Sequence, residues 1–331
     1  MTAGHASIDP FRHHGGRIDL ARRIFPDAPA DWIDLSTGIA PRAYRHATVV
    51  GDARRLPSPD ELADLEHAAA AAFGVDDPAR VVAVAGSELG LRLVAAVLAP
   101  QRVAVVRPGY GGHLTAWGDA KVVPVHDVAP TDYDVTILAN PNNPDGRRVA
   151  RTELTVAAKG SNWLVVDEAF ADADPIDSLA PLALPNVIVL RSFGKFYGLP
   201  GLRVGFVVAP PEIATKLRRL IGEWPVATPV LRTATAVYRD TDWQARQRQF
   251  LDSAAARLDA MLLAAGFAIA GRTALFRLAR HADADTRFLS LAAAGILVRP
   301  FDPGSGLLRF GLPDGRSQWR RLASALQETP S

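Results

Sequence analysis

Five short runs of residues carry side chains that can do chemistry, and each run follows an apolar stretch. They are Ala85-Gly86-Ser87-Glu88, Arg107-Pro108-Gly109-Tyr110, Ala139 to Pro144, Val166 to Phe170, and Arg191-Ser192-Phe193-Gly194-Lys195. In open α/β sheets, ligands bind at the carboxyl ends of the strands. We therefore expect these runs to meet at one edge of a sheet and to supply a lysine, a carboxylate, an amide and an aromatic ring to a single site.

Those four groups are what a pyridoxal 5'-phosphate cofactor requires. A lysine amine condenses with the cofactor aldehyde and later transfers a proton. A carboxylate keeps the pyridine nitrogen protonated, an amide donates to the phenolic oxygen, and an aromatic ring stacks on the face. The phosphate needs arginine, hydroxyl groups and the backbone N–H groups of a helix N-terminus. Each residue alone has an ordinary explanation as a turn former, a cap or a solvated side chain, so the prediction rests on the set.

The motifs resemble those of the class I/II aminotransferases, which are fold type I pyridoxal-phosphate enzymes. Ser192 to Lys195, continued by Gly198 to Gly205, is similar to the lysine signature of that family, and Asn142-Asn143-Pro144 and Asp167 to Phe170 are similar too. The resemblance implies that Lys195 forms the Schiff base, Asp167 contacts the pyridine nitrogen, Asn143 donates to the phenolic oxygen and Tyr110 stacks on the ring. It also implies that Ser192, Arg203 and the amides of Ser87 and Glu88 hold the phosphate. The catalytic set is then Lys195, Asp167 and Tyr110.

Three positions depart from the family pattern. Gly194 stands where many members have serine, which removes one hydroxyl from the phosphate site. Phe170 stands where tyrosine is common, which removes a donor to the phenolic oxygen. Leu56 stands where relatives present a tyrosine to the neighbouring subunit, so the case for a site shared within a homodimer is weakened, although the resemblance still implies a homodimer.

The beginning and the end of the chain carry a narrower resemblance. His14-Gly15-Gly16, Asp34 to Ile39, Gly295 to Phe301 and Leu308 to Pro313 are similar to the threonine-phosphate decarboxylases of cobalamin biosynthesis, which are related to histidinol-phosphate aminotransferases. This implies decarboxylation of L-threonine O-3-phosphate to (R)-1-aminopropan-2-ol O-phosphate, with substrate binding by His14, Gly15, Gly38, Arg299 and Arg309. Arginine suits a substrate that carries a carboxylate and a phosphate, and which arginine takes which anion stays open. The alternative is an aminotransferase acting on histidinol phosphate or a similar phosphorylated amino substrate.

Composition excludes several other classes of protein. Of the 331 residues, 48% are hydrophobic and 22% are charged, and the net charge is only +2, which disfavours nucleic acid as a partner. The absence of cysteine excludes disulfides and suits a reducing cytoplasm. No apolar run reaches the ~20 residues that a membrane span needs, and no histidine spacing predicts a metal site.

Short apolar runs alternating with helical patterns predict an α/β fold with a mostly parallel seven-stranded sheet and a smaller α+β domain. The expected strands are 81–85, 103–106, 122–125, 135–139, 163–166, 187–190 and 204–208, and one of the last two is expected to be reversed. An irregular arm over 1–40 is expected to join the small domain. The large cofactor-binding domain is expected over 41–225, and the small C-terminal domain over 226–331.

Overall fold

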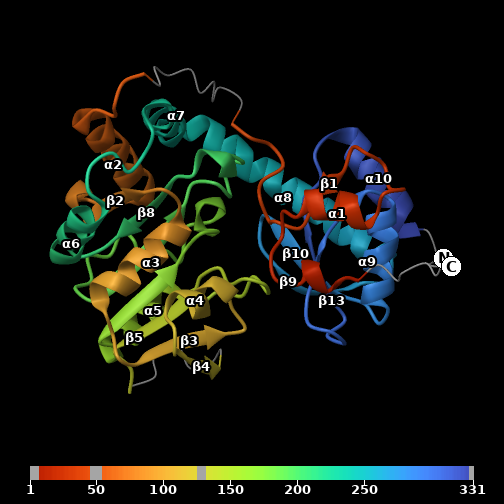
Figure 1. Cartoon of the computed structure of the whole chain (residues 1–331), viewed down its shortest axis with the longest axis horizontal. Helices are drawn as coiled ribbons and strands as arrows, with labels where there is room; N and C mark the ends of the chain where they lie inside the picture. The colour runs from red at the N-terminus through yellow and green to blue at the C-terminus, as the bar shows by residue number, and fades with distance from the viewer. Residues whose placement is uncertain (1–6, 45–53, 125–131, 328–331) are drawn as a thin grey trace. The chain divides into compact units, whose positions relative to one another are not determined.

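The computed structural model describes residues 7–44, 54–124 and 132–327, which form two compact units (Figure 1). The large unit comprises the described residues within Ala43–Asn143 and Arg147–Arg246. The small unit comprises those within Met1–Arg42, Pro144–Gly146 and Gln247–Ser331. The predicted segments 1–40, 41–225 and 226–331 stay a prediction, and parts of them (1–6, 45–53, 125–131 and 328–331) lie outside the described residues.

A seven-stranded sheet forms the centre of the large unit. Its order is β2-β8-β7-β6-β5-β3-β4, and every pairing is parallel except those of β8, which runs antiparallel to both β2 and β7. The strands are β2 (Val81–Val84), β3 (Val103–Arg107), β4 (Lys121–Pro124), β5 (Val135–Ala139), β6 (Trp163–Asp167), β7 (Val187–Ser192) and β8 (Gly205–Val208). The predicted sheet and its reversed strand are therefore confirmed.

Helices cover both faces of this sheet. On β8, Val207 packs in the core with α3 (Ser87–Leu98) and α6 (Pro211–Ile221), whereas the adjacent Phe206 contacts Phe73 of α2 (Pro59–Phe73) and Tyr238 of α7 (Thr228–Arg239). Successive side chains of a strand point to opposite faces, so α3 and α6 lie on one face and α2 and α7 on the other. The remaining elements of this unit are α4 (Gly111–Ala116), α5 (Arg151–Gly160) and the 3-10 turns η2 (Pro78–Arg80), η3 (Ala171–Ala173) and η4 (Pro200–Leu202).

Helix α2 shows why the sequence fixes these boundaries. The Ser58 hydroxyl accepts a hydrogen bond from the amide of Asp60 at 3.2 Å, and Pro59 occupies the first helical position. Gly74 ends the helix with a φ of 70°, a conformation that costs glycine little. The alanine-rich sequence between these ends favours the helix throughout.

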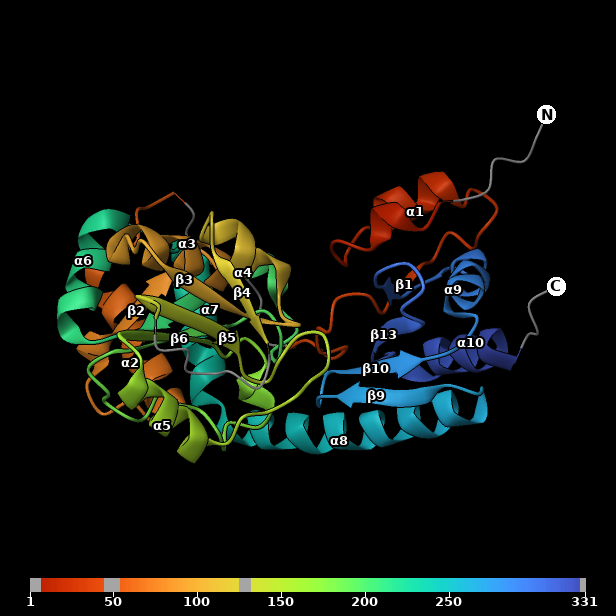
Figure 2. The same ribbon diagram turned by 90° about the horizontal axis from the view of Figure 1, so that it is seen from below.

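The small unit contains a four-stranded antiparallel sheet of order β12-β13-β10-β9. Figure 2 shows α8 (Thr241–Ala264), whose residues from Gln247 onward belong to this unit, running along that sheet. The strands are β9 (Ala268–Arg272), β10 (Phe276–Arg280), β12 (Arg299–Pro300) and β13 (Leu307–Gly311), and this unit also contains the helices α9 (Ala284–Ala293) and α10 (Gly315–Gln327).

The N-terminal arm is more regular than predicted. It contains η1 (Asp9–Phe11), α1 (Ile18–Ile24) and β1 (Ile33–Asp34), and β1 pairs in parallel with β11 (Ile296–Leu297). The prediction of an irregular arm was wrong for these segments because α1 is short and has no side-chain cap, so the sequence carried no start signal. Among the described residues, no helix is long and apolar enough to cross a membrane.

Candidate functional site

Three polypeptide segments form a compact, positively charged cradle at the N-terminus of α3. Gly86 has a φ of 96°, and a Cβ atom added there would lie 2.5 Å from the guanidinium of Arg203. A Cβ atom added at Gly205 would lie 2.3 Å from the amide nitrogen of Ser87. Only glycine at both positions allows this approach, and Ser192 is the strand partner of Gly205. The structure thus brings the predicted residues Ser87, Ser192 and Arg203 together, with Glu88 next in the helix.

Such a cradle is suited to an anion. The first amides of a helix lack intrahelical acceptors and carry the positive end of the helix dipole. Arg203 adds a full positive charge beside them, and its own backbone adopts the left-handed conformation with a φ of 53°. The run around Gly86 was predicted from the sequence, but it was not predicted that Gly86 makes room for the Arg203 guanidinium and Gly205 for the backbone of Ser87.

Asp167 lies at the end of β6 and is held by two groups. Its Oδ2 atom lies 3.0 Å from Nε2 of His113, and its Oδ1 accepts from the amide of Ala169 at 3.0 Å. The His113 side chain is fully buried, and its Nδ1 has no hydrogen-bond partner among the described residues. An ionised carboxylate only accepts hydrogen bonds, so the imidazole donates through Nε2.

His113 was missed by the sequence analysis, although a signal existed. It follows Tyr110 by three residues at the start of α4, which places the two side chains one turn apart on the same side of the helix. Their rings meet edge to face with centroids 5.5 Å apart. The Tyr110 hydroxyl donates to Glu88 at 3.2 Å, so the predicted stacking ring is tied to the helix that forms the cradle.

The predicted amide lies near the same strand ends. The amide nitrogen of Asn140 donates to the carbonyl oxygen of Asp167 at 2.9 Å, and the Asn142 side chain donates to the carbonyl oxygen of Pro108 at 2.9 Å. Asn143 follows directly and is half-buried. These bonds join the ends of β3, β5 and β6, and so position the backbone that leads into Asn143.

Lys195 lies in the turn after β7 and is half-buried. Phe193 and Phe196, its neighbours in the turn, are almost completely buried, and both pack on Tyr197, with ring centroids 4.9 and 5.0 Å away. The Lys195 Nζ lies 5.6 Å from the ring centroid of Phe170. The aromatic residues anchor the turn that carries Lys195.

The predicted substrate residues lie in the small unit. Arg299 and Arg309 are direct partners across β12 and β13. Arg309 is buried and donates to the carbonyl oxygen of Ser36 at 2.7 Å, and Arg299 donates to the carbonyl oxygen of His13 at 3.1 Å. Burial, and then the charge of Arg299, lower the pKa of the Arg309 guanidinium. Two like charges held this close favour the binding of an anion.

The other predicted residues of the small unit pack around Ser36. The Ser36 hydroxyl accepts from the amide of Gly16 at 2.8 Å and donates to Asp34 at 2.6 Å. A Cβ atom at Gly15 would lie 2.3 Å from the Ser36 carbonyl oxygen, so glycine is required there, and His14 directly precedes it. Gly38 has a φ of 64°, which lets the chain turn two residues after Ser36.

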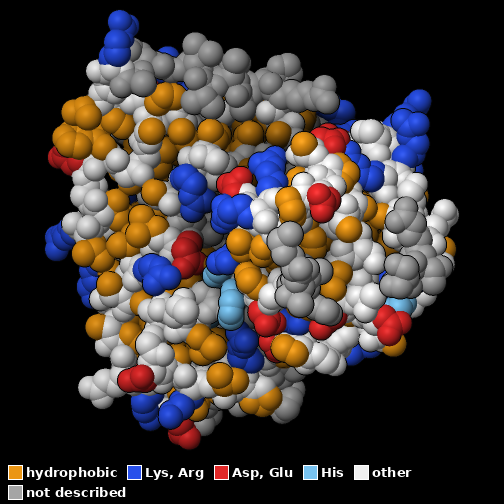
Figure 3. Space-filling view, turned by 45° about the vertical axis from the view of Figure 1, so that its right-hand side comes forward, with side chains coloured by type: hydrophobic (Ala, Val, Ile, Leu, Met, Phe, Trp, Pro, Cys, Tyr) orange, Lys and Arg blue, Asp and Glu red, His pale blue; other side chains and the backbone are white. Residues whose placement is uncertain are grey.

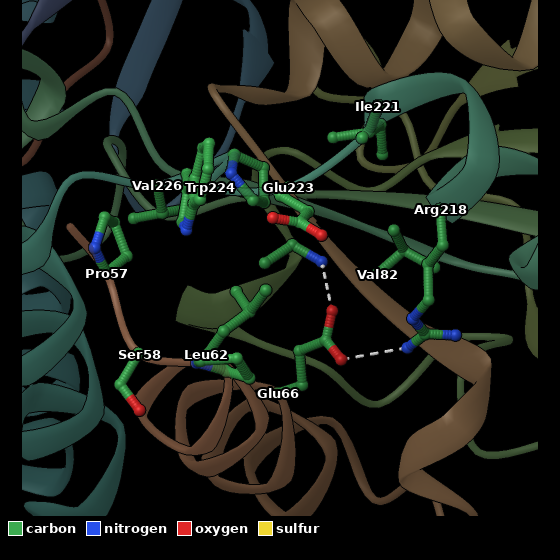
Figure 4. A pocket seen from close by; sticks show the side chains of 14 residues that line it. Pro57, Ser58, Leu62, Glu66, Val82, Arg218, Ile221, Glu223, Trp224 and Val226 are labelled. Carbon is green, nitrogen blue, oxygen red and sulfur yellow. Dashed lines mark hydrogen bonds and ion pairs between the residues drawn. The ribbon is translucent and has the colours of Figure 1, made fainter.

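A cavity of about 320 Å³ lies elsewhere in the large unit (Figure 4). Its wall includes the ion pair between Glu66 and Arg218 at 2.9 Å, and none of the predicted site residues lines it. On the face of the molecule in Figure 3, Lys and Arg side chains are interspersed with Asp and Glu. Among the described residues, no group of three or more His, Cys, Asp or Glu is arranged to hold a metal ion.

The comparisons with known proteins agree on one family. The model of the aminotransferase class I and II family matches residues 34–325. The chain belongs to this family. It is 38% identical to a threonine-phosphate decarboxylase of Pseudomonas aeruginosa over 95% of this chain and 96% of that protein. It is 30% identical to a histidinol-phosphate aminotransferase of Mycobacterium bovis over 96% of this chain and 90% of that protein.

Solved structures of the family share the fold. The histidinol-phosphate aminotransferase of Sinorhizobium meliloti in complex with pyridoxal-5'-phosphate superposes with a TM-score of 0.80 and 20% identity, covering 93% of each chain. The predicted fold class and family are thus confirmed, and pyridoxal 5'-phosphate is the cofactor of this family of enzymes. The residues present here fit that cofactor: the glycine-lined cradle suits its phosphate, and Asp167 is a half-buried carboxylate oriented by His113.

Proposed function

We propose that the protein is a pyridoxal-phosphate-dependent threonine-phosphate decarboxylase, which converts L-threonine O-3-phosphate to (R)-1-aminopropan-2-ol O-phosphate and carbon dioxide in cobalamin biosynthesis. The observation that carries the substrate assignment is the pair Arg299 and Arg309, because a substrate with two anionic groups matches two guanidinium groups. The 38% identity to a threonine-phosphate decarboxylase over nearly the whole length supports the reaction.

When bound, the cofactor supplies an electron sink for the electron pair that remains on Cα when carbon dioxide departs. Lys195 would hold the cofactor through its amine and would carry the proton that the reaction requires. Asp167, oriented by His113, would keep the pyridine nitrogen charged, while Tyr110 would pack against the ring and Asn143 would donate to the phenolic oxygen. Ser87, Glu88, Ser192 and Arg203 bind the phosphate.

The substrate is bound by residues of the small unit in this proposal. Arg309 takes the carboxylate and Arg299 the phosphate, with His14 and the backbone at Gly15 and Gly38 helping. Arg309 is the better carboxylate ligand because it is buried and fixed by Ser36, and a fixed guanidinium orients the bond to be broken.

The second candidate is an aminotransferase acting on histidinol phosphate or a similar phosphorylated amine. It is supported by the 30% identity to the Mycobacterium bovis relative. It uses the same residues, but Lys195 then removes the Cα proton and a keto acid is the second substrate. The two reactions differ in their products and not in the composition of the site.

The deciding experiment incubates the purified protein with cofactor and L-threonine O-3-phosphate. We expect carbon dioxide and aminopropanol phosphate in equal amounts, and a loss of both products in Lys195→Ala. The matched control is Lys216→Ala, at an exposed lysine of α6. A keto product without carbon dioxide, or full activity in Lys195→Ala, overturns the proposal. Parallel incubation with histidinol phosphate and 2-oxoglutarate tests the alternative.

We further propose that the protein is a homodimer located in the cytoplasm. Leu56, which stands at the family position directed to the neighbouring subunit, is 63% exposed in the single chain. A large apolar side chain so exposed is suited to burial by a second copy. Sedimentation of the holoenzyme would give the dimer mass, and Leu56→Arg would lower the apparent mass if this residue lies in the interface.

A further inference from the structure

A buried ionic cluster lies directly behind the ends of β6 and β7. The Arg191 guanidinium donates to Glu168 at 3.1 Å and to Asp172, with which it forms a second ion pair. Glu168 also accepts from the Ser178 hydroxyl at 2.5 Å and from the amide of Leu179 at 2.7 Å. The side chains of Glu168 and Arg191 are at most 1% exposed. One cation is thus enclosed between two carboxylates, away from water.

The cluster lies on the face of the sheet opposite the cofactor residues. Arg191 is the strand partner of Phe206, and its guanidinium lies 4.3 Å from the ring centroid of Phe73 on α2. Leu190 and Ser192 therefore point to the other face, where α3 lies. Asp167 is the strand partner of Leu190 and shares its face.

Two residues of the cluster are nonetheless directly bonded in the chain to residues of the proposed cofactor site. Glu168 directly follows Asp167, and Arg191 directly precedes Ser192. The amide of Glu168 donates to the carbonyl oxygen of Leu190 at 2.9 Å, so the two strand ends are tied by one backbone bond and one buried ion pair. A change in the ion pair must move the backbone that carries Asp167 relative to the backbone that leads to Lys195.

The ion pairs of the cluster hold the ends of β6 and β7 at a fixed separation. Arginine presents two nitrogens in a fixed plane, so one guanidinium fixes the positions of two carboxylates at once. Burial raises the pKa of Glu168, and the ion pair with Arg191 and the Ser178 bond counter this. Lysine at position 191 would keep the charge but could not span both acids in the same way.

We propose that Glu168 and Arg191 are positioning residues, which set the separation of Asp167 and Lys195 from the opposite face of the sheet and so determine how tightly the cofactor is held. The inference rests on the roles proposed above for Asp167 and Lys195. It predicts that the pair acts on cofactor affinity and on the pH titration of the lysine–cofactor absorbance, whereas substrate affinity is left nearly unchanged.

The test compares Glu168→Asp, Glu168→Gln and Arg191→Lys with the wild-type protein. Cofactor dissociation constants are measured by titrating the cofactor-free proteins, and absorbance is followed against pH. Losing one buried charged hydrogen bond changes an equilibrium by about 10- to 100-fold, so we expect cofactor binding about 10-fold weaker or more, a shifted absorbance midpoint, a lower kcat at saturating cofactor, and KM within about 2-fold.

The matched control is Glu66→Gln, which breaks another ion pair of the large unit. Glu66 binds Arg218 at 2.9 Å and the amide of Ala83 at 2.9 Å, on the wall of the cavity in Figure 4. We expect this variant to lose thermal stability with an unchanged cofactor affinity and absorbance midpoint. If it behaves like the Glu168 variants, the effect is general destabilisation and the inference is overturned.

Other outcomes are equally decisive. Glu168→Asp keeps the charge and shortens the side chain, so it tests positioning even if Glu168→Gln does not fold. Folded Glu168 and Arg191 variants with wild-type cofactor affinity and midpoint overturn the inference. A wild-type protein that carries the cofactor on Lys195 but releases no carbon dioxide overturns only the proposed reaction, whereas one that carries no cofactor there overturns both.

Discussion

Arg299 and Arg309 lie directly opposite one another on the antiparallel strands β12 and β13, so two guanidinium groups share one place in the small unit. Like charges on directly opposite strand positions are destabilising. Each is stabilised in part by a backbone carbonyl, from His13 and Ser36 respectively. The charge of Asp34 also counters this repulsion at Arg309. A bound dianionic substrate would reduce the repulsion further, which supports the substrate-binding role proposed for the pair.

The first prediction follows from this pair. Arg309→Met should raise KM for threonine phosphate and lower kcat/KM by about 10- to 100-fold, because a hydrogen bond to a charged group contributes about 1.5–3 kcal/mol. Initial-rate kinetics with carbon dioxide detection measure the loss. Arg280→Met, at an exposed arginine of the same sheet, is the control and should leave kcat/KM within about 2-fold. Equal losses in both variants would contradict a specific role for Arg309.

His113 gives the second prediction. His113→Leu removes the hydrogen bond to Asp167, so the carboxylate loses its orientation and the cofactor should bind about 10-fold more weakly. Titration of the cofactor-free protein, followed by tryptophan fluorescence, measures this affinity. His67→Gln on α2, where the exposed histidine hydrogen-bonds the carbonyl oxygen of Ala63 in its own helix, is the control. Unchanged affinity in His113→Leu would show that the contact with Asp167 plays no part in binding.

The third prediction concerns Gly194, where many relatives have serine. A Cβ atom there would lie 2.8 Å from the Cα of Pro200, so the backbone would have to shift. Gly194→Ser should therefore lower the free energy of unfolding by about 1–3 kcal/mol, and it should not improve cofactor binding. Gly201→Ser, where a Cβ atom would meet nothing within 4 Å, is the matched control for urea denaturation. Tighter cofactor binding in Gly194→Ser would refute this steric account.

The fourth prediction is a pH dependence of stability that depends on Glu61. Its carboxylate binds Arg55 at 2.6 Å and Arg232 at 2.7 Å, and these two contacts lower the pKa of Glu61 from 4.5 to about 2. A carboxylate whose pKa is lower in the folded state stabilises the fold at pH values above its pKa in the unfolded state. This contribution is lost as the pH falls to its pKa in the folded state. The two arginines are partly exposed, so the contribution is about 1 kcal/mol.

Glu61→Gln should accordingly be less stable than the wild-type protein at pH 7, and the difference should shrink between pH 4.5 and about 2. Urea unfolding at several pH values measures it. Glu153→Gln, at an exposed glutamate on α5, should show no such difference. A gap between wild type and Glu61→Gln that is constant with pH would exclude the ionised carboxylate as the cause.

The sheet and the strand-end residues could be predicted because both leave local signals. Valine-rich runs bounded by turn residues mark buried parallel strands, and site residues follow those runs directly. His113 was missed because its contact with Asp167 joins positions 54 residues apart, and a single histidine in a sequence does not show its partner. Arg191 and Glu168 were passed over for a similar reason: their neighbours Ser192 and Asp167 carry the motif, and burial alone reveals the pair.

Local sequence patterns did not predict some short elements of the small unit. Strand β9 alternates exposed and half-buried residues and contains Gly271, whose absent side chain lets it approach the backbone of Asp145. Helix α9 spans ten residues, and no side-chain hydrogen bond caps its N-terminus at Asp283. In both cases the packing within the small unit, rather than intrinsic propensity, decides the structure.

The reversed direction of β8 has a consequence for how the chain can vary. Because β8 begins at the edge where β7 ends, the stretch from Ser192 to Gly205 leaves that edge and returns to it without a crossover helix. Its two halves carry Lys195 and Arg203, so the groups proposed for the cofactor's aldehyde and its phosphate are tethered by only a few residues. Insertions that other loops of the large unit would tolerate should therefore be excluded between positions 195 and 203, and this connection is the poorest choice for opening the chain in a circular permutant.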